Sequence, residues 1–134
     1  MRLVFATLLA AAVSALAGCD AFTNGGTAVR VTVTVDGRLA AGAGAQLLAR
    51  NPANMLEAYT ETIARGGSRS DGRVTLLVLD DGDVPGAAFG YRLLVSPPAG
   101  VSCNRRVFEA VEPGTDTSVT AALAECSVRP RRGG

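Results

Sequence analysis

The chain contains no histidine, no lysine and no tryptophan among its 134 residues. Histidine is the usual general base and metal ligand near neutral pH, and lysine is the usual amine nucleophile. The lack of both residue types excludes most hydrolase, Schiff-base and zinc chemistries. We therefore expect a protein that is not an enzyme and that needs no cofactor.

Aromatic residues are also scarce, at 4% of the chain, and Tyr59 and Tyr91 are its two tyrosines. Sugar-binding sites commonly present exposed aromatic platforms, so this scarcity disfavours a lectin-like role. The charges nearly cancel, because 13 basic residues, all of them arginine, face 12 acidic residues. A near-neutral chain offers no electrostatic reason to bind nucleic acid.

The N-terminal region has the layout of a secretory signal peptide. Arg2 is followed by an apolar run from Leu3 to Ala17 and then by small residues. As a helix this run would span roughly 22 Å, whereas the core of a bilayer is about 30 Å thick. The run is therefore short for a permanent membrane span, and we predict that residues 1–18 are removed.

The end of this region, Leu16-Ala17-Gly18-Cys19, resembles the lipobox of bacterial lipoproteins. The resemblance implies that the Cys19 thiol receives a diacylglyceryl group and that a peptidase then cleaves before Cys19. Two or three acyl chains would anchor the protein stably to a membrane. The protein would then be a lipoprotein of the bacterial cell envelope that faces the periplasm or the exterior. The alternative is an ordinary cleaved signal in which a cysteine happens to occupy this position.

Composition divides the rest of the chain into three parts. Residues 19–27 are a short polar tether, residues 28–127 suit a single domain, and residues 128–134 are a basic tail. The tail either meets phosphate groups or an acidic partner, or is a disordered segment that improves solubility. Its basic residues are Arg129, Arg131 and Arg132.

The domain has the alternating pattern of a β-sheet protein. In "TAVRVTVTVDG" apolar and polar residues alternate, which predicts a half-buried strand. The residues of this stretch that we expect to point inward are Val29, Val31, Val33 and Val35. A second alternating stretch, "AFGYRLLVSPP", is stopped by Pro97-Pro98. The residues of the second stretch that we expect to point inward are Phe89, Tyr91, Leu93 and Val95.

Residues 52–65 carry two conflicting signals. Asn51, Pro52 and Gly66 are typical of the boundaries of a helix. The stretch "YTETI", however, is rich in residues that favour strands. We favour a strand here, and we expect it to pair with the segment after Asp71-Gly72.

Six or seven short strands separated by turns predict an all-β fold, an antiparallel β-sandwich of the transthyretin-like or Ig-like kind. The segments "VRVTVTVDGRLAAGAGAQLLAR", "SDGRVTLLV" and "YRLLVSPPAGVSC" resemble the carboxypeptidase-regulatory, transthyretin-like domain of many bacterial surface proteins. Related enzymes that hydrolyse hydroxyisourate depend on histidine, and the Lys–Asn isopeptide bond of related pilin-type domains requires lysine. Because this chain has neither residue, the resemblance implies a structural or binding module.

Cys103 and Cys126 remain after removal of the signal, and disulfides persist in exported proteins. Their midpoint lies between Gly114 and Thr115, inside the turn "EPGTD". We expect "RRVFEAV" and "TSVTAALAEC" to form a hairpin around this turn, which favours a cross-strand disulfide. The alternatives are free buried thiols or a metal site. The hairpin would place five apolar side chains on the core side: Phe108, Ala110, Val119, Ala121 and Leu123.

Two polar clusters have a plain interpretation beside a functional one. The carboxylates of Asp80, Asp81 and Asp83 suit calcium, but a solvated turn explains the same residues. A second cluster holds a possible serine nucleophile, but the chain has no histidine or lysine to activate it, so we interpret the cluster as a turn. The residues of this second cluster are Ser68, Ser70 and Asp71.

These observations favour a lipid-anchored, non-enzymatic module that presents a sheet face or a strand edge to another envelope protein. The partners expected are therefore a membrane, through the acyl chains on Cys19, and an envelope protein. The alternative is a module that binds a small ligand or a glycan through the loops at one end of the sandwich.

Overall fold

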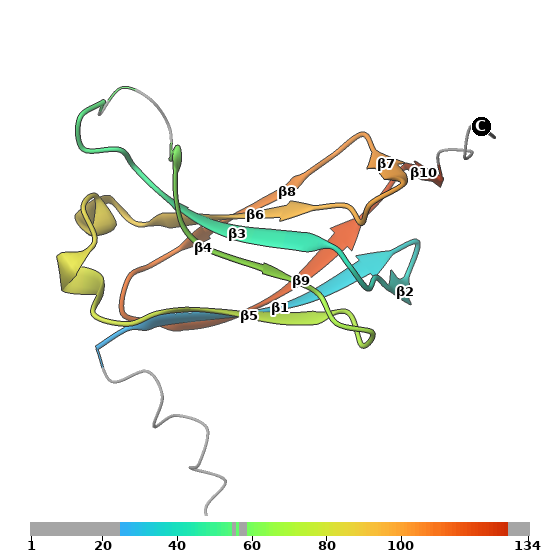
Figure 1. Cartoon of the computed structure of the whole chain (residues 1–134), viewed down its shortest axis with the longest axis horizontal. Coiled ribbons are helices and arrows are strands. Elements are labelled where there is room, and N and C mark those ends of the chain that lie inside the picture. The colour runs from blue at the N-terminus through green and yellow to red at the C-terminus, as the bar shows by residue number, and fades with distance from the viewer. Residues whose placement is uncertain (1–24, 55, 57–58, 129–134) are drawn as a thin grey trace, which may run out of the picture.

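Two four-stranded sheets pack face to face in the computed structural model of the chain (Figure 1). The structure describes residues 25–54, 56 and 59–128. The predicted signal peptide and Cys19 lie outside the described residues, as do the three arginines of the predicted tail. The all-β sandwich expected from the sequence is confirmed.

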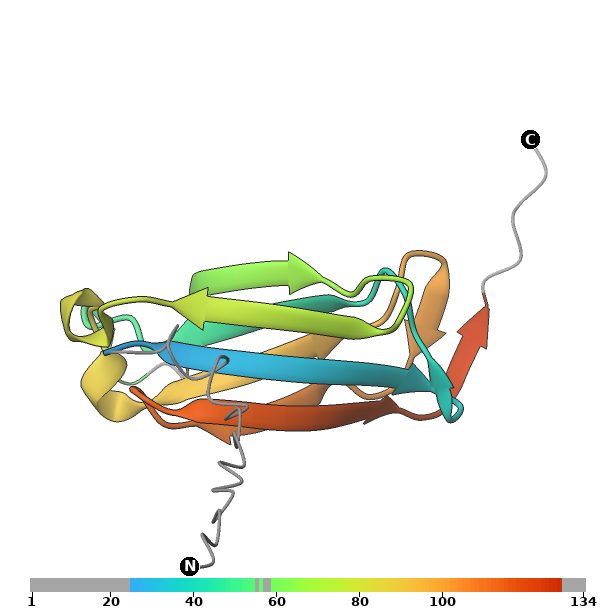
Figure 2. The same cartoon turned by 90° about the horizontal axis from the view of Figure 1, so that it is seen from below.

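Sheet A is built around its longest strand, β1 (Thr27–Val35). On one side β1 pairs antiparallel with β5 (Arg73–Val78), and on the other it pairs parallel with β9 (Asp116–Leu123). The two-residue strand β2 (Arg38–Leu39) folds back antiparallel on the last residues of β1. Figure 2 shows β9 as the outermost strand at one edge of this sheet. The parallel pairing of β1 and β9 was not expected from the sequence.

Sheet B is antiparallel throughout, in the order β4-β3-β6-β8. Its strands are β3 (Gly44–Ala49), β4 (Glu61–Gly67), β6 (Tyr91–Ser96) and β8 (Val107–Val111). The segment with conflicting signals is therefore a strand over its C-terminal part, as we favoured. Its partner was predicted wrongly, because β4 pairs with β3 and the chain then crosses to the other sheet before β5 begins.

The two ends of the sandwich differ. Two short 3₁₀ helices, η2 (Asp81–Asp83) and η3 (Ala87–Phe89), lie at the end where β1 begins, which we call the η end (Figure 1). A separate two-stranded ribbon of β7 (Val101–Cys103) and β10 (Cys126–Val128) lies at the opposite end, which we call the disulfide end. Seven longer strands thus run between an end made of helical turns and an end made of a ribbon.

The core forms where the inward faces of the two sheets meet. Val29, Val31 and Val33 of β1 are at most 1% exposed, as their alternation predicted. Tyr91 and Leu93 of β6, in sheet B, pack into the core from the opposite side, and each is at most 1% exposed. Branched and aromatic side chains on facing strands exclude water from this layer, which is the main stabilising term of such a sandwich.

Phe89 does not continue the inward row of β6, contrary to the expectation. Its side chain is 49% exposed because it ends the 3₁₀ turn η3 rather than starting the strand. Gly90 then takes a positive φ of 81°, which breaks the alternation before Tyr91. Strand periodicity therefore begins two residues later than the sequence pattern indicated.

The predicted hairpin between β8 and β9 is wrong. β8 pairs with β6 in sheet B, and β9 pairs with β1 in sheet A, so the turn at 112–115 crosses between the sheets. On β9 the expected face is correct, since Ala121 and Leu123 are buried. On β8 the expected face is inverted, because Phe108 is 54% exposed while Val111 is 3% exposed. Pairing with β6 instead of β9 reverses which side of β8 meets the core.

The turn at Asp71-Gly72, which precedes β5, requires a glycine at position 72. Gly72 has a φ of +68°, and a Cβ there would lie 2.8 Å from the backbone oxygen of Val33. The Gly72 carbonyl accepts a hydrogen bond from the Val33 N–H (2.8 Å), and the Ala40 N–H donates to the Val33 carbonyl (2.9 Å). Both backbone groups of Val33 thus face the β5 side of β1, so β2 continues the sheet beyond the start of β5.

Candidate functional site

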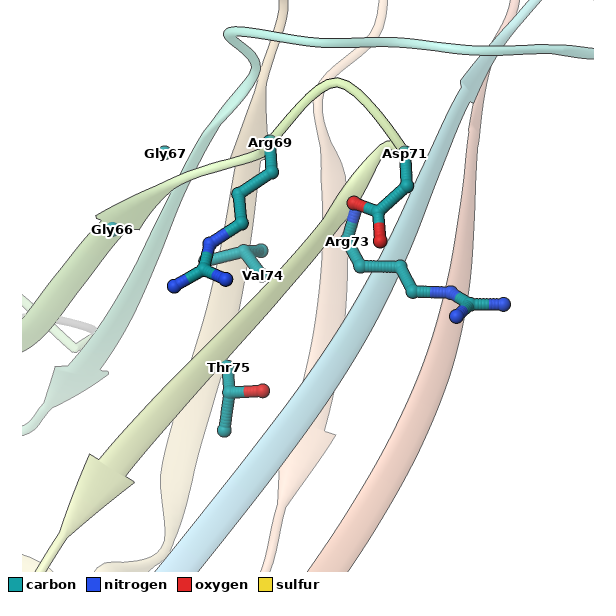
Figure 3. A pocket seen from close by; sticks show the side chains of 7 residues that line it. All are labelled: Gly66, Gly67, Arg69, Asp71, Arg73, Val74 and Thr75. Carbon is teal, nitrogen blue, oxygen red and sulfur yellow. The ribbon is translucent and has the colours of Figure 1, made fainter.

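An open hollow of about 370 Å³ lies at the disulfide end, beside the turn that joins β4 to β5 (Figure 3). Its lining residues are Gly66, Gly67, Arg69, Asp71, Arg73, Val74 and Thr75. The floor is close-packed, because a Cβ on Gly66 would lie 2.8 Å from the Cγ2 atom of Val74. Glycine at this position therefore lets the edge of β4 rest directly against β5.

The two arginines of this hollow do not converge on one point. Figure 3 shows the Arg69 side chain crossing the hollow toward Val74, while the Arg73 side chain extends away over β1. The Asp71 Oδ1 atom accepts a hydrogen bond from the Arg73 backbone N–H (3.1 Å), which holds the turn. A guanidinium group is well suited to a carboxylate or phosphate, so the hollow offers one positive group to an anionic ligand.

Arg73 also borders the outer face of sheet A, where polar side chains form two rows across the strands. Thr32 lies between Arg73 and Thr120 in the first row. Arg30 lies between Thr75 and Ser118 in the second row. The same six side chains line a shallow depression of about 370 Å³. The face therefore presents hydroxyl groups flanked by guanidinium groups, which can make hydrogen bonds but cannot act as nucleophiles without a base.

One of these arginines is already paired. The Arg30 Nη1 atom lies 3.1 Å from the Asp116 Oδ2 atom, and the two side chains are 42% and 30% exposed. Such an exposed ion pair contributes little to stability. It does neutralise Arg30, so among the described residues of this face the positive charge that remains is on Arg73.

Ser68 is a structural residue, in agreement with the turn interpretation. Its side chain is buried, and the hydroxyl donates to the Ala40 carbonyl (2.5 Å) and accepts from the Ala43 N–H (2.9 Å). The hydroxyl therefore fastens the link between β2 and β3 to the end of β4. Ser70 and Asp71 are exposed in the same turn, and β5 begins at Arg73 as expected.

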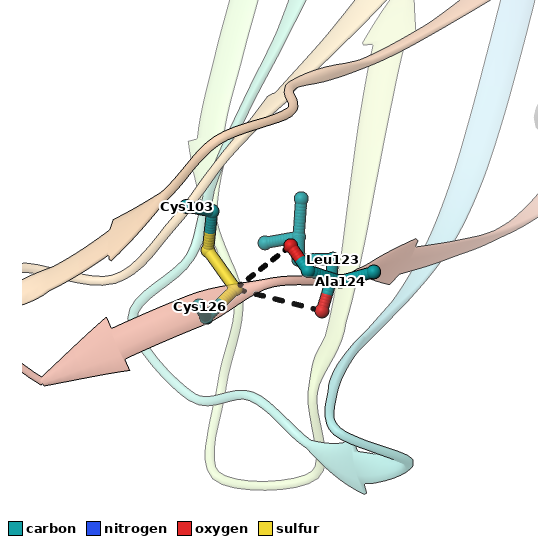
Figure 4. Close-up of a disulfide and its surroundings, with 4 residues drawn as sticks. All are labelled: Cys103, Leu123, Ala124 and Cys126. Carbon is teal, nitrogen blue, oxygen red and sulfur yellow. Dashed lines mark hydrogen bonds between the residues drawn. A yellow bond between two sulfur atoms is a disulfide. The ribbon is translucent and has the colours of Figure 1, made fainter.

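The disulfide predicted between Cys103 and Cys126 is confirmed, with an S–S distance of 2.01 Å (Figure 4). The strands it joins are β7 and β10 rather than a continuation of β8 and β9, and the two cysteines are directly opposed in that ribbon. The Cys126 sulfur lies 3.5 Å from the carbonyl oxygen of Leu123, the last residue of β9. The bond thus ties the segment after β9 to the loop that connects β6 and β8.

The three aspartates at the η end, Asp80, Asp81 and Asp83, differ in how far they are buried. Asp80 and Asp83 are exposed, whereas Asp81 is 7% exposed. The Asp81 carboxylate accepts hydrogen bonds from the Thr27 N–H (3.1 Å) and the Thr27 hydroxyl (2.5 Å). It also accepts from the backbone N–H of Gly114, in the turn between β8 and β9. Donors from the protein occupy this carboxylate, which the sequence pattern had offered as a calcium ligand.

Tyr91 lies in the core near this carboxylate. Its hydroxyl is buried and has no hydrogen-bond partner among the described residues. Burial, together with the negative charge of Asp81, raises the pKa of Tyr91 from 10.0 to about 12. A neutral phenol is therefore held in the core over a wide pH range.

A cluster of arginine and aromatic side chains near η3 was missed by the sequence analysis. The guanidinium carbons of Arg50 and Arg92 lie 5.4 Å and 4.6 Å from the centre of the Tyr59 ring. The Tyr59 hydroxyl donates to the Phe89 carbonyl (2.9 Å). The positive groups are attracted by the face of the ring, which holds the end of the loop before β4 against sheet B. Nothing in the spacing of these residues signals the contact.

Neither a bilayer span nor a metal-ligand cluster emerges from the described parts of the chain. No helix within residues 25–54, 56 and 59–128 has the length and apolar character needed to cross a bilayer. Across the same residues, no three cysteine or acidic side chains gather as metal ligands would.

Comparison with known proteins identifies the fold. No protein-family model matches the chain, and no curated protein matches it significantly. Among solved structures, the Bacillus anthracis TIE protein matches with a TM-score of 0.50 and 8% identity over 75% of this chain. A shaft pilin, SpaA from Lactobacillus rhamnosus GG (D295N mutant), matches with a TM-score of 0.47 and 12% identity over 75% of the chain. A 9R-lipoxygenase from Cyanothece matches with a TM-score of 0.41 and 9% identity over 76% of the chain.

The chain spans only part of each of these proteins, at 17%, 48% and 17% of their lengths respectively. Identities this low show likeness of fold alone, and one fold serves unrelated functions. The role of this chain must therefore be argued from its own residues.

We predict that Asp81→Ala lowers the free energy of unfolding by about 3 kcal/mol, because three donors lose a charged acceptor in a buried position. Chemical denaturation followed by circular dichroism measures the change, since the chain has no tryptophan for fluorescence. The exposed Asp83→Ala is the matched control and should change stability by no more than about 0.5 kcal/mol. Equal effects of the two substitutions would contradict the structural role of Asp81.

We predict that stability falls as the pH rises from 10 toward 12, and that Tyr91→Phe removes this fall. The pKa of Tyr91 is 10.0 in the unfolded chain and about 12 in the folded chain. The stabilisation that comes from this difference is therefore complete below pH 10 and is lost as the pH rises toward 12. The chain has no lysine, whose side chain would otherwise titrate in the same window. Denaturation midpoints at a series of pH values test this, and Tyr59→Phe, which keeps Tyr91, should retain the fall. A decline that persists in Tyr91→Phe would show that another group causes it.

We predict that replacing both Cys103 and Cys126 with serine lowers the free energy of unfolding by about 3 kcal/mol, because the unfolded chain regains the entropy of an open loop. Denaturation under non-reducing conditions measures the loss. Ser102→Ala combined with Ser127→Ala, a pair next to the cysteines in the same ribbon, is the control and should have little effect. A double cysteine variant as stable as the parent would mean that the ribbon stays ordered without its bond.

Proposed function

We propose that the protein is a lipid-anchored component of the bacterial cell envelope whose β-sandwich acts as a non-enzymatic structural or protein-interaction module. The observation that carries the anchoring is Leu16-Ala17-Gly18-Cys19 placed directly behind a short apolar run. Cleavage before Cys19 would leave an acylated cysteine eight residues ahead of Thr27, where β1 begins. The η end would then be the end of the sandwich nearest the membrane.

The proposed interaction role is supported by what the exposed surfaces offer. Rows of threonine, serine and arginine side chains on the outer face of sheet A provide hydrogen-bond donors and acceptors without a general base. The strand edges provide backbone groups that can pair with another chain. A rigid disulfide-linked module held at a membrane by one end is suited to presenting such surfaces to a neighbouring envelope protein.

A second candidate function is the binding of a small anionic ligand or a glycan by the loops at the disulfide end. The observation that favours it is the open hollow next to Arg69, at the end of the sandwich farthest from β1's first residue. Retention on a glycan array that is lost in Arg69→Ala would support this function. Recovery of one stoichiometric protein from detergent-solubilised membranes would support the interaction role instead.

We predict that Cys19→Ser abolishes acylation and cleavage, so that the chain keeps residues 1–18 or leaves the membrane fraction. The hydroxyl cannot form the thioether that the lipobox resemblance implies. Membrane fractionation combined with intact mass measurement reports acyl groups and the mature N-terminus together. The double serine variant of Cys103 and Cys126 is the control, because it removes the two other cysteines and should still be acylated. A Cys19→Ser protein that matures and partitions like the parent would disprove lipid anchoring.

A further inference from the structure

The sandwich has four edge strands, and they differ in how well they are protected against pairing with another chain. Sheet A ends in β5 and β9, and sheet B ends in β4 and β8. An exposed edge carries unpaired N–H and C=O groups, and natural proteins usually block it with charges, bulges, short strands or covering segments.

Both edges of sheet B are protected. β8 has only five residues, and Glu109 lies on the same side of the strand as the inward-facing Val107 and Val111. A charge on the inward side of an edge strand opposes extension of the sheet. The register of β4 with β3 shifts at a bulge beside Leu47. β4 also contains a charged residue, Arg65, and it ends in two glycines.

The β5 edge of sheet A is partly covered. β4 from the other sheet lies close against it, because Gly66 leaves no room for a Cβ beside Val74 and Leu76. The strand also begins with the exposed Arg73 and is followed along the same side of β1 by the short strand β2. The β5 edge is therefore protected by the charge of Arg73 and by the strands β4 and β2, which lie next to it.

The β9 edge has none of these features over its central part. β9 is eight residues long, and after Asp116 it contains no charged residue, no proline and no glycine. Its register with β1 is unbroken from Asp116 to Leu123, and β1 is its one partner strand within the described chain. Val119 is only half-buried, although its register partner Val31 is 1% exposed. The strand is thus long, regular and open on its outer side (Figure 2).

Ladder geometry identifies the backbone groups that are free on this edge. The Thr115 carbonyl accepts from the Ala28 N–H (3.1 Å), so residue 115 faces β1. In a parallel ladder every second residue turns both of its backbone groups to the neighbouring strand. The alternate residues therefore direct their N–H and C=O groups to the open side. These residues are Asp116, Ser118, Thr120 and Ala122.

We propose that the β9 edge is a self-association surface, on which β9 of a second copy of this chain pairs antiparallel about a two-fold axis at Val119. In this register Ser118 of each copy faces Thr120 of the other, and Asp116 faces Ala122. The four residues with free backbone groups then pair only with one another. The result is a continuous six-stranded sheet from the β5, β1 and β9 strands of two copies.

Side chains across the proposed seam are compatible. Val119 faces its own copy at the centre, which is a favourable β-branched pair on the inward side. The hydroxyls of Ser118 and Thr120 face each other on the outer side. No like charges lie opposite one another, because Asp116, the one charged residue of β9, faces an alanine.

Charge along the whole edge favours a second copy in this antiparallel arrangement. The β8 and β9 edge carries Glu112 and Asp116 at the η end, and Arg105, Arg106 and Glu125 at the disulfide end, so the disulfide end is positive by one charge. A two-fold axis across the seam places the η end of one copy beside the disulfide end of the other. Glu112 of each copy then lies at the same end of the seam as Arg105 and Arg106 of its partner, which favours this orientation over the parallel one. Asp116 is already paired with Arg30, in the one ion pair within the described residues, so Glu112 is the acidic group of the η end that is left for the partner's arginines.

Lipid anchoring is not required for this pairing, so the two proposals fail independently. The test uses the full chain in detergent and compares two proline variants. Thr120→Pro removes an N–H group that points to the open side of β9, and the ladder with β1 is left intact. Thr75→Pro is the matched control, because Thr75 lies opposite Arg30 in a pair whose backbone groups do not bond, so its N–H points outward on the other edge of the same sheet.

Sedimentation equilibrium measures the association constant of each protein. We expect the parent and Thr75→Pro to form dimers with the same affinity, and Thr120→Pro to raise the dissociation constant by at least about tenfold, because each dimer loses two hydrogen bonds. Circular dichroism and denaturation establish that both variants are folded. Hydrogen exchange of the parent provides a second readout, in which the amides of Ser118, Thr120 and Ala122 slow as protein concentration rises.

Three results would overturn the proposal. One is a parent chain that stays monomeric with rapid exchange at those three amides. Another is a dimer that Thr120→Pro leaves unchanged, which would place the contact elsewhere. The third is a monomer whose β9 amides become protected only when an envelope extract is added, which would assign this edge to a strand of a different protein.

Discussion

Burial of one face of β1 is the constraint on which the rest of the structure depends. β1 is the strand of sheet A with long partners on both sides, and its inward valines are almost completely excluded from solvent. Because side chains alternate along a strand, burying those valines directs Arg30, Thr32 and Thr34 to the opposite face. The polar rows on the outside of sheet A follow from the same register that fills the core, so the surface available to a partner is a consequence of packing.

The acidic residues before η2 illustrate how a polar cluster can serve the fold. A buried carboxylate needs partners, and Asp81 receives them from the start of β1 and from the turn that carries the chain from β8 into β9. Three segments that are distant in sequence are thereby held at the η end, next to a phenol that burial keeps neutral. This is also the end at which β1 begins, so the first residue of that strand is fixed by the Asp81 carboxylate.

Surfaces and backbone edges are the features of the described residues that a partner could contact. A chain without histidine and lysine has few groups that can move a proton near neutral pH, and its arginines stay charged. What remains is hydrogen bonding by hydroxyls, attraction by guanidinium groups and pairing of strands. The interaction module that we propose would use these properties, and association through β9 would use the edge that lacks the usual protection among the described strands.

The sequence by itself determined the strands with strict alternation, the turn at Asp71-Gly72 and the cysteine pair, because each of these depends on local chemistry or on there being two cysteines outside the predicted signal region. It also indicated a signal with a lipidation motif, which lies outside the described residues. Tertiary structure alone decided the parallel pairing of β1 with β9, the inverted face of β8, the exposure of Phe89 and the buried state of Asp81. Local patterns specify which residues alternate, but they do not specify which strand becomes the neighbour. That choice is made by the packing of two sheets as a whole, and it determines which face, which edge and which carboxylate are left for solvent or for a partner.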